Sequence, residues 1–147
     1  MMANLGLKKW LALALGVLCL GGCGKGGGKT RNPTEERLYK IGKAYRDTCF
    51  RLETAPKSFD EIKPSLEGDI PEDLLVSPND GQAFVIIWGV NVNNLVPSRN
   101  NPFTVIGYER IGVDGTRYVL RAPLGIVKMT DEEFEKANFP PGHRAPG

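Results

Sequence analysis

The sequence is poor in the residues on which many catalytic sites depend. It contains one histidine, His143, and this residue stands in a proline-rich stretch near the carboxyl end. A Ser, His and acid triad needs a base within hydrogen-bond reach of its nucleophile. No glycine-rich segment follows an expected strand and ends in Lys-Ser or Lys-Thr, as a phosphate-binding loop does. These scarcities argue against a triad hydrolase and against a nucleotide-binding loop.

Apolar runs of membrane-spanning length are also missing. The run from Trp10 to Leu20 is too short to cross a bilayer, which takes about 20 such residues. It follows Lys8 and Lys9 and precedes small residues, an order typical of an export signal. We therefore expect residues 1–22 to be a signal peptide that is removed.

The end of this signal resembles the lipobox that lipoprotein signal peptidase reads, here formed by Leu20, Gly21, Gly22 and Cys23. The resemblance implies that the Cys23 thiol receives a diacylglyceryl group, that the chain is cut before Cys23, and that the new amino terminus is acylated. Several acyl chains make a durable anchor, since each buried methylene contributes about 0.8 kcal/mol. The alternative is a plain secretory signal with an unmodified cysteine.

The lipobox also indicates a location. We expect a lipid-anchored protein of the cell membrane or outer membrane, with its domain on the extracytoplasmic side, in the periplasm or at the surface. Gly24 stands where some lipoproteins retained in the inner membrane have Asp, and by the same resemblance this favours the outer membrane. Residues 23–31 are mostly Gly and Lys and predict a flexible tether with a reach of about 16 Å.

Cysteine is scarce in the expected mature chain. Cys19 leaves with the signal and Cys23 carries lipid, so Cys49 is the only free thiol and no internal disulfide can form. One thiol and one histidine cannot provide the usual ligands of a zinc site. Cys49 has apolar neighbours on an expected helix, which favours an inert, buried thiol over a nucleophile.

An excess of charge of one sign is missing too. The chain has 19 basic and 17 acidic residues, and without the two lysines of the signal it has 17 of each. The mature protein therefore lacks the basic surface of a general nucleic-acid binder.

The first expected helix begins after the tether. Asn32 can cap it, Pro33 suits the first helical position, and Glu35 completes a capping box. Pro56 stops it, and a second capping pattern opens a short helix at Ser58. Apolar residues recur every three or four positions and predict one buried face: Leu38, Ile41, Tyr45, Cys49 and Leu52.

Strand character follows the helices. Segments 83–88, 103–109, 117–121 and 125–129 are apolar, β-branched or alternating, with turns between them, and Thr130 and Glu133 then open a last helix. This order predicts an α+β fold: an N-terminal amphipathic helix packed on a small antiparallel sheet of three to four strands, with a short C-terminal helix. We expect one domain over residues 32–138 and a disordered proline-rich tail over 139–147.

Three segments together resemble the pseudopilins of type II secretion systems. Residues 38–66 (LYKIGKAYRDTCFRLETAPKSFDEIKPSL) are similar to their helix and the segment that follows it. Residues 77–85 (SPNDGQAFV) resemble the entry to their first strand, and residues 104–134 resemble their sheet and its Thr-x-Glu-Glu-Phe helix. The resemblance implies a pseudopilin-like fold over most of the mature domain.

The sequence also departs from that family. It has a lipobox and a glycine tether in place of a prepilin peptidase site and a long apolar helix. Pro123 and Leu124 stand where the relatives usually have an Asp-Gly turn, and no His precedes Asp114 at the usual spacing. These departures argue against filament assembly while the fold carries over.

Calcium is the one cofactor with some support. Asp80 and Asp114 offer oxygen ligands, with Asn79 beside them, and the resemblance implies a possible site because some pseudopilins bind calcium in a loop of the sheet. The alternative is that Asn-Asp-Gly and Asp-Gly only form turns. The acidic pairs at 72–73 and 132–133 are expected to be solvated rather than a glycosidase pair, because adjacent residues point to different faces of a helix.

The best candidate recognition surface is the loop over residues 90–102. Loops of this length are often functional. Trp88 and Leu95 beside it offer an apolar contact, although Trp88 can equally belong to the core. The polar residues that we expect to contact a partner are Asn91, Asn93, Asn94, Arg99, Asn100 and Asn101.

Three functional hypotheses follow. The first is a non-catalytic structural or protein-interaction lipoprotein of the envelope, with an unidentified envelope protein as partner. The second is an accessory subunit of a type II secretion or pilus-like machine. The third is an enzyme that uses carboxylates alone.

Overall fold

The computed structural model describes residues 30–95, 97–98 and 102–146. Contacts divide the chain after Thr30, and the fold described here is that of the second unit, Arg31–Gly147. The signal peptide, the lipobox with Cys23 and most of the tether lie outside the described residues. Within the described part of the chain, no helix is both long enough and apolar enough to span a membrane.

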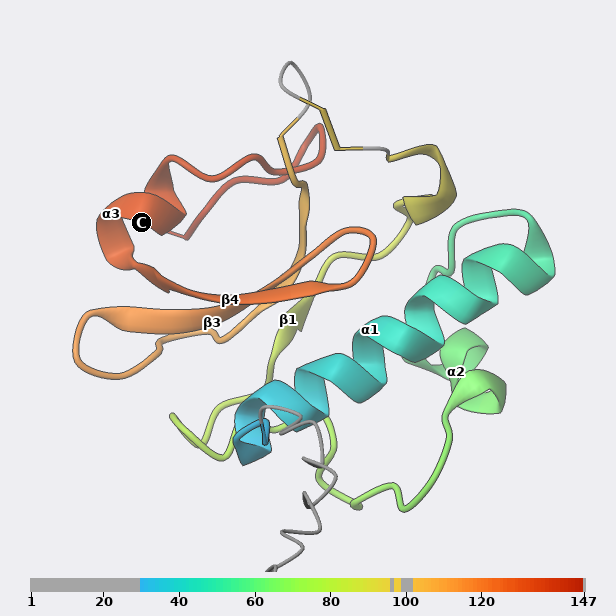
Figure 1. The fold of residues 1–147 in the computed structure, drawn as a ribbon, viewed down its shortest axis with the longest axis horizontal. Helices are drawn as coiled ribbons and strands as arrows, with labels where there is room; N and C mark the ends of the chain where they lie inside the picture. Colours follow the sequence, from blue (N-terminus) through green and yellow to red (C-terminus); the bar gives the residue numbers. More distant parts are fainter. Residues whose placement is uncertain (1–29, 96, 99–101, 147) are drawn as a thin grey trace, which may run out of the picture. The chain divides into compact units, whose positions relative to one another are not determined.

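Helices come first in the second unit and strands follow (Figure 1). The helical elements before the sheet are α1 (Pro33–Leu52), α2 (Phe59–Ile62) and the 3-10 helix η1 (Lys63–Ser65). The strands are β1 (Val85–Ile86), β2 (Val105–Tyr108), β3 (Thr116–Arg121) and β4 (Gly125–Thr130). A second 3-10 helix, η2 (Val92–Asn94), lies between β1 and β2, and α3 (Asp131–Glu135) follows β4.

The start of α1 is fixed by local contacts. The Asn32 side chain accepts a hydrogen bond from the Glu35 N–H at 2.8 Å, and the Glu35 carboxylate accepts one from the Asn32 N–H at 3.2 Å. The helix ends at Glu53, whose backbone is left-handed with φ of 55°. Leu52, which was expected to face inward, is 41% exposed because the last turn of α1 extends past the core. The capping pattern expected at Ser58 forms no side-chain cap, since the Glu61 carboxylate accepts from the Lys57 N–H instead.

The sheet is antiparallel with strand order β1-β2-β3-β4, which agrees with the predicted α+β class and with the upper end of the predicted three to four strands. Its best-paired part is the β3–β4 hairpin, in register from Thr116 opposite Thr130 to Arg121 opposite Gly125. β1 is much shorter than the segment 83–88 predicted for it. The reason is that the Phe84 N–H turns away to the Leu75 carbonyl, at 2.8 Å.

A β-bulge in β2 changes which side chains face which layer. Ile106 and Gly107 together lie opposite Leu120, because the register shifts between Val105 and Gly107. Ile106 therefore packs in the cluster under α1, while Tyr108 packs on the other face of the sheet. The shift also sends Glu109 back toward the α1 side, where it contacts Ser77.

The second unit has three layers, with α1 on one face of the sheet and α3 with the carboxyl-terminal segment on the other (Figure 1). α1 approaches its face closely at Gly42, where a Cβ atom would lie 2.8 Å from side-chain atoms of both Leu120 and Leu124. On the opposite face, Phe134 of α3 is buried against Val105 and Val119. Each face thus has its own apolar cluster.

The tail expected to be disordered is packed instead. The Val105 N–H donates to the Asn138 carbonyl at 2.8 Å, so the chain joins the edge of β2 where it leaves α3. Phe139 then packs edge-on against Tyr108 with ring centroids 6.1 Å apart, and His143 Nε2 lies 3.1 Å from the Tyr108 hydroxyl. The prediction of disorder over 139–147 is wrong for the described residues because these aromatic rings complete the second apolar cluster.

Candidate functional site

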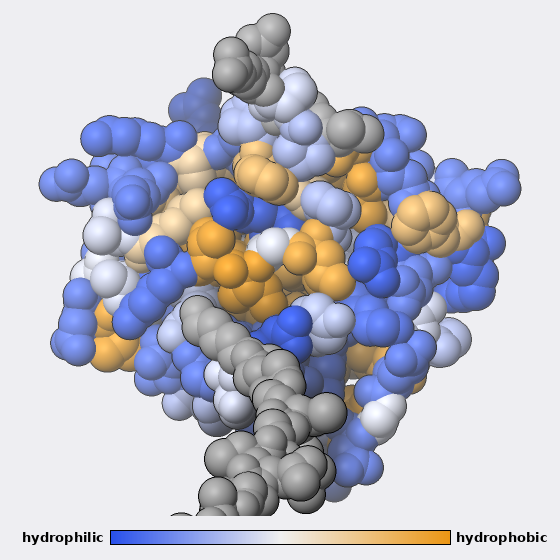
Figure 2. Space-filling model, in the orientation of Figure 1, coloured by the Kyte–Doolittle hydropathy of each residue, from blue (hydrophilic) through white to orange (hydrophobic). Residues whose placement is uncertain are grey.

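An apolar groove lies between α1, the segment that follows β1, and the β3–β4 turn. Its volume is about 470 Å³. We call it the Phe50 groove; it is lined by Arg46, Asp47, Phe50, Val92, Asn93, Leu95, Pro97 and Pro123. On the face of the molecule where α1 lies beside the β3–β4 hairpin, Figure 2 shows apolar side chains gathered between charged ones.

The segment after β1 is shaped by η2. The Asn91 side chain accepts a hydrogen bond from the Asn93 N–H at 3.1 Å, and the Leu95 N–H donates to the Val92 carbonyl at 3.2 Å. This single turn buries Val92 in the core and leaves Leu95 only partly buried at the groove. One wall of the groove therefore follows from a local turn.

Tyr45 of α1 holds this segment in place. Its hydroxyl lies 3.1 Å from the carbonyl oxygens of both Ile87 and Val90 and accepts a hydrogen bond from the Val90 N–H at 3.0 Å. Its ring stacks on Trp88 with centroids 5.7 Å apart. Burial raises the pKa of Tyr45 to about 12, so the hydroxyl stays a donor at neutral pH. Trp88 is therefore part of the support behind the groove rather than a free contact point.

The thiol behind the groove is not exposed. Cys49 is fully buried on α1, with Sγ 3.8 Å from the Val90 carbonyl oxygen. Burial raises the pKa of the Cys49 thiol, which keeps it protonated and unreactive at neutral pH. A packing role accounts for this residue.

The groove has an exposed aromatic rim and one charge of each sign. The Phe50 side chain is 65% exposed. Beside it, the Arg46 guanidinium lies 3.0 Å from the Asp47 carboxylate, which also pairs with Lys43 at 2.9 Å. Burial alone would raise the pKa of Asp47, but hydrogen bonds from Lys43 and Arg46 outweigh it and lower that pKa. The rim therefore carries a fixed negative charge and a fixed positive charge.

One polar atom near the groove has no partner. The Asn93 side-chain oxygen is buried and accepts no hydrogen bond within the described residues. Buried polar atoms are nearly always hydrogen-bonded in native proteins, and each exception calls for an explanation. A donor from a bound molecule would satisfy this oxygen.

The predicted recognition residues fall into two groups. Asn91, Asn93 and Asn94 lie on or beside η2, and Asn93 lines the groove. Arg99, Asn100 and Asn101 lie outside the described residues. Sequence reasoning did not identify the α1 side of the groove. Phe50 is next to the buried Cys49 in the sequence, and whether it lines a groove depends on where the loop after β1 packs against α1.

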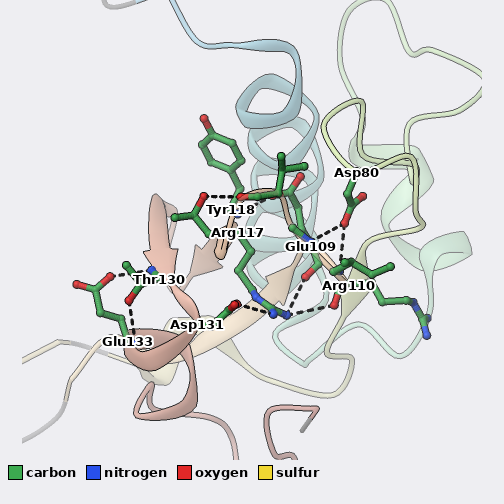
Figure 3. Close-up of polar contacts among 12 residues, drawn as sticks. Asp80, Glu109, Arg110, Arg117, Tyr118, Thr130, Asp131 and Glu133 are labelled. Carbon is green, nitrogen blue, oxygen red and sulfur yellow. Dashed lines mark hydrogen bonds and ion pairs between the residues drawn. The ribbon is translucent and has the colours of Figure 1, made fainter.

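A second polar cluster surrounds Glu109, the first residue of the β2–β3 connection (Figure 3). The Glu109 side chain has 0% exposure. It accepts hydrogen bonds from the Ser77 hydroxyl, the Tyr118 N–H at 2.7 Å and the Asn79 amide at 3.2 Å. We call Ser77, Asn79, Asp80 and Glu109 the Glu109 cluster. Sequence reasoning missed Glu109, because the bulge that turns it inward leaves no trace in the alternation pattern.

Asp80 joins this cluster to the β2–β3 connection. Its carboxylate accepts from the N–H groups of Ile111 at 3.1 Å, Gly112 at 2.9 Å and Gln82 at 2.9 Å (Figure 3). Burial alone would raise the pKa of Asp80, but the hydrogen bonds from Gly112, Gln82 and Ile111 outweigh it and lower that pKa. The carboxylate thus acts as an anchor for the chain at residues 110–112.

The residues proposed for calcium serve different segments. Asp114 occupies the turn between Val113 and Thr116 with a left-handed φ of 52°, whereas Asp80 binds backbone N–H groups. Across the described ranges, no group of three or more His, Cys, Asp or Glu side chains is placed to hold a metal ion. Both residues lie in turns, as expected if the Asn-Asp-Gly and Asp-Gly sequences only form turns. Calcium binding stays a prediction.

One residue of each acidic pair has a structural partner. Glu133 closes a capping box with Thr130 at the start of α3, and Asp131 beside it binds the Arg117 guanidinium at 2.9 Å (Figure 3). Asp73 pairs with Arg37 at 2.9 Å. Glu133 and Asp73 therefore contribute to capping and ion pairing, respectively.

Comparison with known proteins adds no relative. No protein-family model matches the chain, and no curated protein or solved structure shows significant similarity to it.

Proposed function

We propose that the chain is a membrane-anchored lipoprotein of the cell envelope, and that its folded unit is a non-catalytic structural or protein-interaction component. The observation that carries the proposal is the lipobox, Leu20-Gly21-Gly22-Cys23, at the end of an export signal. A compact unit begins at Arg31, eight residues after Cys23. That spacing suits a domain held close to its membrane by a short tether.

The polar groups of the Glu109 cluster form hydrogen bonds within the chain, which supports a non-catalytic role for the folded unit. Ser77 and Glu109 form a hydroxyl–carboxylate pair, but both are fully buried. The Asp80 carboxylate accepts three backbone hydrogen bonds. These groups stabilise the fold in the positions where they lie.

The Phe50 groove supports the interaction part. Its exposed aromatic side chain, its apolar walls and the unpartnered Asn93 oxygen are features of a surface that receives another molecule. An envelope protein that presents an apolar side chain and a hydrogen-bond donor would suit this groove.

Lipidation is tested at Cys23. Membranes from cells that express the wild-type chain should contain it in acylated form, and mass spectrometry should find Cys23 as the first residue. Cys23→Ser should move the chain to the soluble fraction or leave it unprocessed, while the matched variant Cys19→Ser should behave like the wild type. A native chain that retains Met1 and carries no fatty acid would refute the proposal.

A second candidate is an accessory subunit of a type II secretion or pilus-like machine. It is favoured by the combination of a 20-residue helix with an antiparallel sheet in strand order β1-β2-β3-β4, which suits the pseudopilin-like fold proposed from the sequence. Secretion subunits should then co-purify with the detergent-solubilised chain. Recovery of the chain without them from cells that express the machine would contradict this candidate.

A further inference from the structure

The Phe50 groove carries a protruding group and a hollow on the same patch. Phe50 projects from α1 with 65% of its side chain exposed, and the apolar side chains of Leu95, Pro97 and Pro123 line the hollow next to it. A patch that presents both shapes can pair with an identical patch about a two-fold axis, since each copy then gives and receives the same contact.

We propose that the Phe50 groove is a homodimer interface, in which Phe50 of each copy enters the groove of the other. A second copy of this chain thus occupies the groove. The membrane location of the dimer rests on the proposed function.

The charges of the groove argue for a second copy. Arg46 and Asp47 are adjacent and of opposite sign, and both line the groove. Within one copy the two side chains already pair at 3.0 Å. In the proposed dimer the two pairs lie together about the two-fold axis, so that Arg46 of each copy also faces Asp47 of the other. The patch is therefore complementary in charge to itself.

The remaining charge of the chain does not oppose this pairing. The expected mature chain has 17 basic and 17 acidic residues, so two copies do not repel each other through net charge. Lipid anchors also confine the copies to one surface, which raises their effective concentration for a weak contact.

The first experiment uses the full-length lipidated chain in native membranes. A benzoylphenylalanine introduced at Phe50 should give an adduct of twice the chain mass on irradiation. The matched control is the same probe at Ile111, which is similarly exposed at 62% but lies outside the groove. An adduct with a different protein, no adduct, or an equal dimer yield from Ile111 would overturn the proposal.

The second experiment exchanges charges in differently tagged copies. Arg46→Glu and Asp47→Lys should each cause a several-fold loss of the dimer adduct, because each brings like charges together. Mixing the two variants should restore adducts between the tags, because the carboxylate introduced in one copy then faces the ammonium group introduced in the other. Mixing would not restore adducts if the substitutions had damaged the fold, so the urea midpoint of each variant is measured as well. If both midpoints are near that of the wild type and mixing still restores no adduct, the proposal is overturned.

Fractionation separates this proposal from the proposed function. A chain in the membrane fraction that gives no dimer adduct refutes the dimer alone. A soluble, unlipidated chain that still gives the adduct refutes the anchor and retains the dimer.

Discussion

The Glu109 cluster and the Phe50 groove use their side chains in opposite ways. In the cluster, a fully buried carboxylate has three donors, and Asp80 has three more. In the groove, an aromatic side chain is exposed and a buried amide oxygen has no partner. The polar groups of the cluster have partners within the chain and contribute to folding, whereas the exposed ring and the unpartnered oxygen of the groove are available for binding. Substitutions in the two regions should therefore differ in what they change.

The largest effect is expected at Glu109. Glu109→Ala should lower the free energy of unfolding by about 3 kcal/mol, because the Ser77 hydroxyl and the Tyr118 N–H lose their acceptor inside the protein. Urea denaturation measures this loss. Glu109→Gln keeps the size and one acceptor, so it should lose about 1–2 kcal/mol; equal losses for the two variants would show that the carboxylate is not the anchor.

A smaller effect is expected at Phe139, an aromatic residue that packs within the second apolar cluster. Phe139→Ala should lower the free energy of unfolding by about 2 kcal/mol, below the range for fully buried Phe because the ring is only partly buried. Thermal melting and urea denaturation both report it. A loss below about 0.5 kcal/mol would mean that the carboxyl-terminal segment does not stabilise the second apolar cluster.

Asp80 should have a still smaller effect that depends on pH. Asp80→Ala should lower the free energy of unfolding by about 1–2 kcal/mol at neutral pH, through three lost hydrogen bonds at a partly exposed site. The pKa of Asp80 is lowered in the folded state, so its contribution is present above the unfolded pKa of about 4 and is lost as pH falls through the folded pKa. Urea titrations from pH 7 to pH 3 should therefore show the wild type and variant converging; a constant difference would contradict the assignment.

The smallest effect on stability is expected at Phe50. Phe50→Ala should change the free energy of unfolding by less than about 0.5 kcal/mol, because an exposed side chain gives up little contact on truncation. The same change should abolish the dimer contact. Compared with Phe139→Ala, it separates an aromatic that stabilises the fold from one that binds. A large loss of stability at Phe50 would remove that distinction.

Local signals in the sequence predicted local structure well. Two of the three predicted capping boxes, those at Asn32 and Thr130, are present, whereas Ser58 forms no side-chain cap. Alternation and turn residues predicted the α+β class and an antiparallel sheet of three to four strands; the sheet has four, and the β3–β4 hairpin closely follows its predicted segments. These features depend on neighbours along the chain.

Features that depend on distant contacts were not predictable. Glu109 is buried because a bulge in β2 turns it toward Ser77, 32 positions away. The proline-rich tail is ordered because Phe139 and His143 meet Tyr108, and composition alone cannot show such a contact. The α1 wall of the groove depends on where the loop after β1 packs. For the candidate site, the sequence indicated the loop but not its opposing surface.

Because β1 is short, the carboxyl-terminal segment also covers part of the edge of β2. Beyond β1, the backbone of β2 would have an open hydrogen-bonding edge, and Asn138 occupies it by accepting from the Val105 N–H. Open edges recruit strands from other molecules and promote aggregation. A chain truncated after Ala137 would bare this edge together with the rings of Tyr108 and Phe134, so it should precipitate at temperatures where the intact chain remains in solution.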